Sequence, residues 1–419
     1  MLTLLQCTKP LSLTLFLSLF SWLNTTILSA QEAEEGTKIM ATTTNNQDNF
    51  GKSVAVSGNY SVIGAWTDDD RGPEAGAAYI YFRQDEKTDH WIMREKLLAS
   101  DGEAFNNFGG KVAIEGDFAF VTAQGNDDFA GAIYVFQRQK AEDNTWKEVQ
   151  KIMAPDKSFG DYFGTSITVN NGRIAVGAYG EDDKGRSAGA VYIYQLTEDQ
   201  WKFENKIHDQ EGAPNDRFGS SVALAGNTLV VGANRDNNAG SIIIFERKEK
   251  GWNQTLKIFS SDGKAKDRFG SSLALSDDYL AVGADGAEAF MGAVYVFERN
   301  LGGENNWGEL KKIQPIDADT DDRFGKTIAM SGEYLLAGSE GHEMGMGATY
   351  LFRKDKAGEN NWGLANKMNA MDGSPRDLFG SSVAMSGEDI FIGAYQSDRK
   401  GGAYIFRAED KSIFASKDD

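Results

Sequence analysis

Cysteine and proline are scarce in this chain of 419 residues, which contains one cysteine, Cys7, and six prolines. Cys7 lies before the apolar run Leu11–Leu23, so a chain cleaved after that run has no cysteine. Disulfide bonds are then excluded as a source of stability, and the fold must depend on the burial of apolar side chains. The three histidines are too far apart in sequence for a metal motif with paired histidines.

Long apolar runs are also missing, apart from Leu11–Leu23. That run follows a short segment whose one side-chain cation is Lys9, and small residues end it, which predicts a secretory signal peptide over residues 1–30. The alternative is a retained membrane anchor, but polar residues 24–26 interrupt the run before it reaches the ~20 apolar residues of a span. We therefore expect one domain over residues 31–419, with no membrane span after cleavage.

Positive charge is in deficit, with 43 Lys and Arg against 62 Asp and Glu and a formal net charge of −19. Such a surface repels nucleic acid and anionic lipid, which argues against both as partners. The acidic residues are spread along the chain instead of forming a tail, as expected of a solvated folded surface.

A repeat fills the rest of the chain. Seven Phe-Gly pairs recur at intervals of 51 to 58 residues, at Phe50, Phe108, Phe163, Phe218, Phe269, Phe324 and Phe379. A lysine precedes each phenylalanine by twelve residues: Lys38, Lys96, Lys151, Lys206, Lys257, Lys312 and Lys367. A tryptophan precedes six of them by seventeen residues: Trp91, Trp146, Trp201, Trp252, Trp307 and Trp362.

Each unit has the pattern of four short strands, and the third is apolar on both faces, which predicts an all-β fold with covered sheets. Seven such units predict a seven-bladed β-propeller of four-stranded antiparallel blades. The phenylalanines should insert between adjacent sheets, and the recurring Gly-Ala pairs should allow close backbone approach. The lysines should lie on the outer strands, where a charge opposes edge-to-edge pairing.

The ring needs a closing strand. Residues 38–41 repeat the register of the outer strands, so we expect the N-terminus to supply the outer strand of the last blade. A competing closure by residues 412–416 resembles residues 257–261.

The segments Asn306–Lys312 and Asp322–Gly325, with the Gly-Ala pairs, resemble the FG-GAP repeat family, which includes the propeller of integrin α subunits. The resemblance covers Lys38 to Arg407 and implies the propeller fold. It also implies a role in adhesion or ligand binding, although a few FG-GAP propellers are attached to enzymes.

Calcium loops of the kind that many integrin-type repeats carry are not expected here, because the turns between the first two strands are too short and poor in carboxylates. Asp317, Asp319 and Asp321 imitate the first three ligands of such a loop, but Asp322 replaces the glycine that should follow. They are the candidate metal ligands, against the alternative of a solvated turn. No cofactor is firmly predicted, and Ca²⁺ is the candidate.

The loops between the second and third strands and the crossovers into the next blade should emerge on one face. The candidate ligand-binding residues in these loops are Trp66, Asp68, Asp70, Phe129, Glu181, Asp183 and His342. Aromatic rings could stack on a sugar and carboxylates could bind its hydroxyls, although buried packing and surface solvation are the simpler interpretations. His342 is expected to be a surface histidine.

Aspartate recurs two residues before six of the phenylalanines: Asp48, Asp161, Asp216, Asp267, Asp322 and Asp377. These carboxylates should accept backbone N–H bonds and hold the crossover turns. The functional alternative is a ring of carboxylates around the channel mouth.

Motifs of hydrolases and phosphate-binding loops do not occur in the sequence. We therefore expect a secreted, extracellular or periplasmic binding or adhesion module whose partner is an extracellular glycan or a surface protein. Two alternatives stay open: a carbohydrate-active enzyme, either a polysaccharide lyase or a glycoside hydrolase, and a structural surface protein.

Overall fold

The computed structural model describes residues 36–41, 45, 47–85, 90–140, 144–304, 306–359 and 361–408. The predicted signal peptide and the competing closing segment at residues 412–416 lie outside these ranges. Within them, no helix is both long and apolar enough to cross a membrane.

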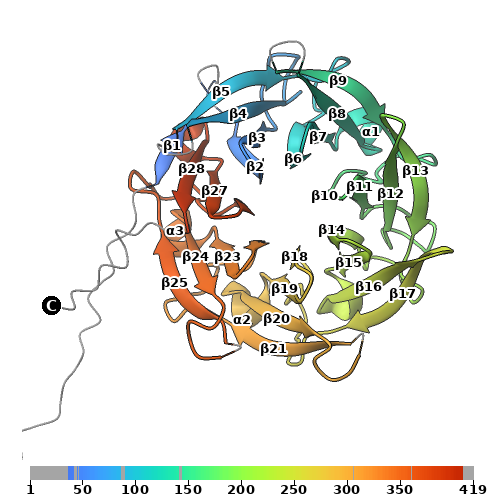
Figure 1. The fold of residues 1–419 in the computed structure, drawn as a ribbon, viewed down its shortest axis with the longest axis vertical. Coiled ribbons are helices and arrows are strands. Elements are labelled where there is room, and N and C mark those ends of the chain that lie inside the picture. The colour runs from blue at the N-terminus through green and yellow to red at the C-terminus, as the bar shows by residue number, and fades with distance from the viewer. Residues whose placement is uncertain are drawn as a thin grey trace, which may run out of the picture. The chain divides into compact units, whose positions relative to one another are not determined.

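Seven four-stranded antiparallel sheets form a ring, which confirms the predicted seven-bladed propeller (Figure 1). The first strands lie nearest the centre: β2 (Phe50–Ser57), β6 (Phe108–Glu115), β10 (Ser166–Asn170), β14 (Phe218–Ala225), β18 (Ser272–Leu275), β22 (Thr327–Ser331) and β26 (Ser382–Ser386). The second strands are β3 (Tyr60–Ala65), β7 (Phe118–Ala123), β11 (Arg173–Ala178), β15 (Thr228–Ala233), β19 (Tyr279–Ala284), β23 (Tyr334–Ser339) and β27 (Asp389–Ala394).

The third strands are β4 (Ala77–Asp85), β8 (Ala132–Gln139), β12 (Ala190–Thr197), β16 (Ser241–Lys248), β20 (Ala293–Arg299), β24 (Ala348–Arg353) and β28 (Gly402–Arg407). The outer strands are β5 (His90–Leu97), β9 (Thr145–Ile152), β13 (Gln200–Ile207), β17 (Gly251–Ile258), β21 (Trp307–Ile313), β25 (Gly363–Met368) and β1 (Thr37–Ile39). Short helical turns join some second and third strands: α1 (Asn126–Phe129), η1 (Asp236–Asn238), α2 (Ala287–Phe290), α3 (His342–Gly345) and η2 (Ser397–Arg399).

The N-terminal strand closes the ring, as predicted. Strand β1 pairs antiparallel with β28, with Lys38 opposite Tyr404, and completes the sheet β1-β28-β27-β26. The last blade therefore combines the two ends of the described chain, and this pairing prevents the ring from opening at that blade.

The Phe-Gly pairs hold neighbouring blades together. Phe108 is fully buried, packs edge-on against Tyr134 at 5.4 Å, and belongs to an apolar cluster that also contains Ile80 of the preceding blade. The Gly-Ala pairs also lie at the contact between blades. A Cβ on Gly232 would lie 2.1 Å from the carbonyl oxygen of Gly270 in the next blade. Only glycine permits this approach, which confirms the predicted packing roles.

The aspartates two residues before phenylalanine hold the crossover turns. Each accepts a hydrogen bond from the backbone N–H three residues earlier, as Asp161 does from Ser158 at 2.7 Å. The other pairs are Asn45–Asp48, Ala213–Asp216, Lys264–Asp267, Asp319–Asp322 and Ser374–Asp377. All six aspartates are buried, so they form no ring of carboxylates around the channel. Burial raises the pKa of Asp161 to about 6, although its backbone hydrogen bond lowers it.

The repeated lysines lie on the outer strands, as expected, and their ammonium groups are also held by carboxylates. Lys151 in β9 and Tyr134 in β8 each lie 2.7 Å from the carboxylate of Asp101 in the crossover that enters their blade. The same Tyr-Asp-Lys arrangement recurs as Tyr192-Asp156-Lys206, Tyr295-Asp262-Lys312, Tyr350-Asp317-Lys367 and Tyr404-Asp372-Lys38. Each triad ties a crossover to the outer half of its blade.

Truncation of one buried phenylalanine of the Phe-Gly pairs should destabilise the whole ring. Phe218→Ala leaves a cavity between two blades, and we expect it to lower the free energy of unfolding by about 3–5 kcal/mol. Chemical denaturation measures this directly. Phe159→Ala is the matched control, because that side chain is 79% exposed and its loss should change stability by less than about 0.5 kcal/mol. Equal effects of the two substitutions would contradict the proposed role of the Phe-Gly pair.

Candidate functional site: the loop face and the channel mouth

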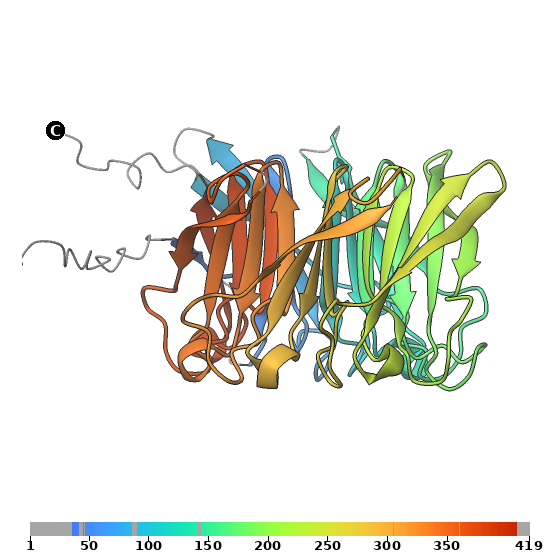
Figure 2. The ribbon, with the colours of Figure 1, turned by 90° about the horizontal axis from the view of Figure 1, so that it is seen from below.

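The crossovers and the loops between second and third strands share one face of the ring, which we call the loop face. The helical turns lie together along the lower edge of Figure 2. Each loop is bonded to the next crossover: Phe105 and Asn107 donate backbone N–H bonds to the carbonyl oxygens of Pro73 and Glu74, at 2.8 and 3.0 Å. The loops are thereby fixed relative to one another, which suits precise recognition.

The first strands of all seven blades line a central channel. Its section near the loop face has a volume of about 240 Å³ and is lined by Lys52, Lys111 and Lys326 with several serines and threonines. Further along, the lining becomes mainly valine, alanine, leucine, isoleucine and methionine. The polar section therefore opens on the loop face.

Two positions of each repeat surround this opening, which we call the channel mouth. One is the residue before each Phe-Gly pair, where the first strand starts: Asn49, Asn107, Tyr162, Arg217, Arg268, Arg323 and Leu378. The other follows each small pair, where the second strand ends: Trp66, Gln124, Tyr179, Asn234, Asp285, Glu340 and Tyr395. These side chains differ from blade to blade, in contrast to the repeated residues that hold the ring.

Asp68 and Asp70 share the ammonium group of Lys96, which lies 2.7 and 2.6 Å from their carboxylates. Asp68 is 1% exposed and also accepts a hydrogen bond from Tyr79 at 3.2 Å. In this first blade Asp68 takes the place of the crossover aspartate in the Tyr-Asp-Lys triad. Asp70 is exposed and remains accessible to a ligand.

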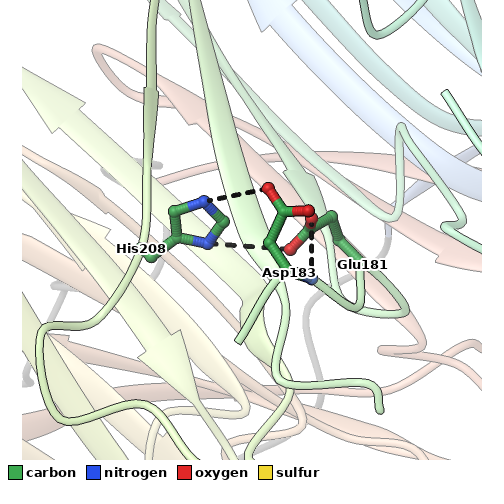
Figure 3. Close-up of side chains that lie close together, drawn as sticks. All are labelled: Glu181, Asp183 and His208. Carbon is green, nitrogen blue, oxygen red and sulfur yellow. Dashed lines mark hydrogen bonds and ion pairs between the residues drawn. The ribbon is translucent and has the colours of Figure 1, made fainter. Parts of the chain in front are cut away.

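Glu181 and Asp183 meet His208, a residue that the sequence did not single out (Figure 3). In the described part of the chain these three form the one group of acidic and histidine side chains whose ligand atoms all lie within 4.8 Å. Lys206 occupies the same place, with its Nζ 2.8 Å from Glu181, 2.7 Å from Asp183 and 2.6 Å from Asp156. An ammonium group at that position disfavours a cation there.

His342 is buried, so the expectation of a surface histidine was wrong. It is 7% exposed, and its Nδ1 lies 2.8 Å from Asp322 while its Nε2 lies 2.8 Å from the Nζ of Lys367. It begins α3, which folds back over the buried Asp322 of the crossover. Both ring nitrogens have partners within the repeat framework.

The candidate metal ligands Asp317, Asp319 and Asp321 are not brought together as a group of ligand atoms. Asp317 accepts hydrogen bonds from Lys367 at 2.7 Å and from Tyr350 at 3.1 Å, so each of its oxygens has a partner. Asp319 accepts one from the backbone of Thr320 at 2.7 Å. Ca²⁺ needs six to eight oxygen ligands, and these residues do not offer them in this arrangement.

The aromatic candidates lie around the channel mouth. Phe129 is 41% exposed and its ring lies 5.7 Å from that of Tyr162, which stacks on Tyr179 at 5.1 Å. On another part of the mouth, Lys52 lies 4.5 Å from the ring of Trp66 and 4.3 Å from that of Tyr395. These rings offer flat apolar surface beside hydrogen-bonding groups, which is the chemistry that sugars require.

Two larger pockets open on the loop face. One, of about 600 Å³, is lined by Gln47, Asn49, Thr67, Asp69, Pro73, Glu74, Gln396 and Arg399. The other, of about 800 Å³, contains Asp317, Asp319, Asp321 and His342 and reaches Arg323, Glu340 and Tyr395 at the mouth. The second pocket thus contains His342 and the three predicted metal ligands, whereas the first contains none of the predicted candidate residues.

Sequence reasoning missed the positive charge at the mouth. Arg217, Arg268 and Arg323 occupy the position before Phe-Gly in three consecutive blades, and this pattern was visible in the aligned repeats. Acidic residues dominate the loops in number and conceal this pattern in the overall charge. The carboxylates of Asp68, Glu181 and Asp317 are paired with lysines. The guanidinium groups of the three arginines, by contrast, are partly exposed around the opening.

The charge on Lys206 should be essential to its blade. Lys206→Met leaves the carboxylate of Glu181, which is 4% exposed, without its cationic partner, and we expect a loss of about 3 kcal/mol of stability. Lys202→Met is the control, because Lys202 forms an exposed pair with Glu198 that should contribute less than about 1 kcal/mol. Denaturant midpoints at pH 7 measure both. A loss no larger than that of the control would contradict the buried role of Lys206.

Lys52 should titrate far below an ordinary lysine. Burial in the channel and the nearby charge of Lys111 lower its pKa to about 8, so its charge disappears as the pH rises above 8. Because the charged form is disfavoured in the folded state, this group makes folding more favourable as the pH rises from 8 to about 10.4.

An NMR titration of the lysine side chains, assigned with Lys52→Arg, measures this pKa. Lys96 is the internal comparison, because burial lowers its pKa but hydrogen bonds to Asp68 and Asp70 raise it above the ordinary value. A titration midpoint above pH 10 for Lys52 would contradict its burial in the channel beside the charge of Lys111.

The sequence repeats match a known family. A family model described as the FG-GAP repeat matches seven segments of the chain: residues 34–81, 91–136, 146–194, 201–245, 252–297, 307–352 and 362–406. The segments together cover most of the chain and correspond to the blades.

Two curated proteins are similar over part of their length. Human integrin alpha-11 is 28% identical over 176 residues, which is 36% of this chain and 14% of the relative. Mouse integrin alpha-11 is 35% identical over 104 residues, which is 21% of this chain and 9% of the relative. The matched segments thus span a small part of either relative.

Solved structures also share the architecture. A putative 6-phosphogluconolactonase from Bacteroides uniformis superposes with a TM-score of 0.56 at 12% identity, covering 76% of this chain and 85% of that chain. Its counterpart from Bacteroides fragilis gives 0.54 at 11% identity, over 76% and 84% of the respective chains. At these identities the likeness shows the fold alone.

Proposed function

This chain belongs to the FG-GAP repeat family, and from that premise we propose that it is an extracellular binding or adhesion module. The module recognises an extracellular glycan or a surface protein with the loop face, around the channel mouth. One observation carries the proposal: the mouth positions vary from blade to blade on a ring whose other repeated positions are fixed by packing and ion pairs. Variation on a rigid scaffold is the arrangement used for recognition.

The glycan is favoured by the rings at the mouth. The exposed ring of Phe129 and the stacked pair Tyr162 and Tyr179 give adjoining flat surfaces. Asp70 and Asp183 lie exposed on the same face and accept hydrogen bonds from sugar hydroxyls. Trp66 adds a ring on another part of the mouth, where Lys52 lies 4.5 Å from it.

The proposed signal peptide over residues 1–30 and the similarity to integrin alpha-11 support an extracellular location. The formal net charge of −19 for the whole chain supports a soluble, exported domain that avoids nucleic acid and anionic lipid. Cleavage after residue 30 releases a chain whose first strand, β1, closes the propeller.

A carbohydrate-active enzyme is the second candidate, and the pocket of about 800 Å³ favours it. The pocket brings His342, Glu340, Glu343 and Arg323 to one cavity, and carboxylates opposed across a cavity are the groups that cleave glycosidic bonds. In this geometry His342 is held between Asp322 and Lys367, which suits a positioned acid or base as well as a structural link.

An array of glycans and polysaccharides tests the proposal, probed with the mature protein in calcium and in chelator. We expect binding without turnover, unchanged by chelator, and weakened about tenfold by Phe129→Ser because one stacking surface is lost. Phe203→Ser is the matched control, since Phe203 is 47% exposed and lies in the outer strand β13 instead of in a loop or crossover of the loop face.

A product assay on each bound glycan separates the candidates. Released oligosaccharide would replace the binding module by the enzyme, and an array without binding would exclude the glycan and leave the surface protein. Loss of binding in chelator would indicate a bound cation, contrary to the pairing of Asp68, Asp183 and Asp317 with lysines.

A further inference from the structure

We propose that one half of the channel mouth is a binding site for the anionic groups, sulfate or carboxylate, of an acidic polysaccharide. The site consists of Arg217, Arg235 and Arg268 with Lys326, and we call it the arginine site. The inference rests on the proposed function, because it names the class of glycan that the loop face recognises.

The arginine site is a cavity of about 260 Å³ lined by Arg217, Asn234, Arg235, Arg268, Ser271, Asp285 and Lys326. It shares Ser271 and Lys326 with the channel section that contains Lys52 and Lys111. The two linings together hold six cationic side chains and one carboxylate, Asp285. Counted formally, this is an excess of five positive charges on a protein whose formal net charge is −19, and burial lowers the pKa of both Lys52 and Lys111 among them.

The protein neutralises little of this charge itself. Arg268 lies 3.2 Å from Asp285, and Lys326 lies 3.8 Å from Asp285 and 3.7 Å from Glu340. Among the described residues, the other four cations, Lys52, Lys111, Arg217 and Arg235, form no ion pair. By contrast, the lysines of the Tyr-Asp-Lys triads each have at least one carboxylate within 2.7 Å.

Holding these cations together costs stability. Burial lowers the pKa of the Arg217 guanidinium, and the charges of Arg235 and Arg268 lower it further, although Tyr179 opposes them. Burial and the neighbouring lysine likewise lower the pKa of Lys52. Unpaired like charges that reduce stability are characteristic of binding sites, since a bound anion relieves their repulsion.

A sugar polymer is the anion that best fits the surroundings. Arg217 lies over the ring of Tyr179 at 4.9 Å, next to the stacked Tyr162 and the exposed Phe129, so the charged site continues into the aromatic surfaces. Planar guanidinium groups bind sulfate and carboxylate with two parallel hydrogen bonds. A polysaccharide with anionic substituents therefore meets both chemistries in one stretch of the mouth.

Matched polysaccharides test the site: sulfated chains with their desulfated forms, and uronic acid chains with their methyl esters. We expect the full-length mature protein to bind the charged member of at least one pair more tightly, and raised salt to weaken this binding. Arg217→Gln and Arg235→Gln should each reduce the affinity for the charged form about tenfold to a hundredfold. Arg186→Gln, an exposed arginine of the loop face outside the mouth, should leave it unchanged.

The free proteins give an independent readout. Relief of repulsion should make Arg217→Gln and Arg235→Gln at least as thermally stable as the parent, and dextran sulfate should raise the melting temperature of the parent but not of the double variant. Arg235 is exposed, so Arg235→Gln should not disturb folding. It therefore tests the site by itself if Arg217→Gln does not fold.

The outcomes separate the two proposals. Equal binding of charged and neutral members, or charge preference that survives both arginine substitutions, would overturn the arginine site while the glycan-binding function stands. No binding to any polysaccharide would overturn the arginine site and the glycan-binding function, and it would leave the surface protein as the partner. Tighter, arginine-dependent binding of a single-stranded oligonucleotide would replace the polysaccharide by a nucleic acid.

Discussion

The contact between neighbouring blades at each Phe-Gly pair is the interaction on which the rest of the structure depends. The phenylalanine fills the apolar space between two sheets, and the glycine after it brings its carbonyl oxygen against a small residue of the preceding blade. The distance between neighbouring blades is thus set by a buried phenylalanine and by glycines at which no larger side chain fits. Because the contact recurs seven times, the loop face inherits a fixed circle of strand ends.

The repeats also distinguish the residues that stabilise the ring, which recur from blade to blade, from those of the channel mouth, which differ. The buried aspartates before phenylalanine and the lysines of the outer strands hold the crossovers, so they account for carboxylates that would otherwise suggest cation binding. What remains variable is the channel mouth, where aromatic side chains occupy one part and arginines another. Because the side chains at equivalent positions differ, each part of the mouth can contact a different chemical group of the ligand. Seven identical positions would offer the same contact in every blade.

The sequence predicted the blades, their number and the N-terminal closing strand, because these depend on spacing along the chain. It did not predict that Lys151 and Asp101 meet, since they are 50 residues apart and nothing local shows where the lysine points. Burial of His342 was missed for the same reason: its partners Asp322 and Lys367 come from the crossover and the outer strand. The arginine site required knowing that Arg217 and Arg235 share one cavity.

The central claim is that ligands bind at the loop face around the channel mouth. Hydrogen–deuterium exchange of the mature protein, with and without its tightest polysaccharide, tests this most directly. The account predicts protection in the crossovers and in the loops between second and third strands, strongest near Tyr179, Arg217 and Arg235. Protection confined to the opposite face, for example at the hairpin turn Glu198–Asp199, would contradict it.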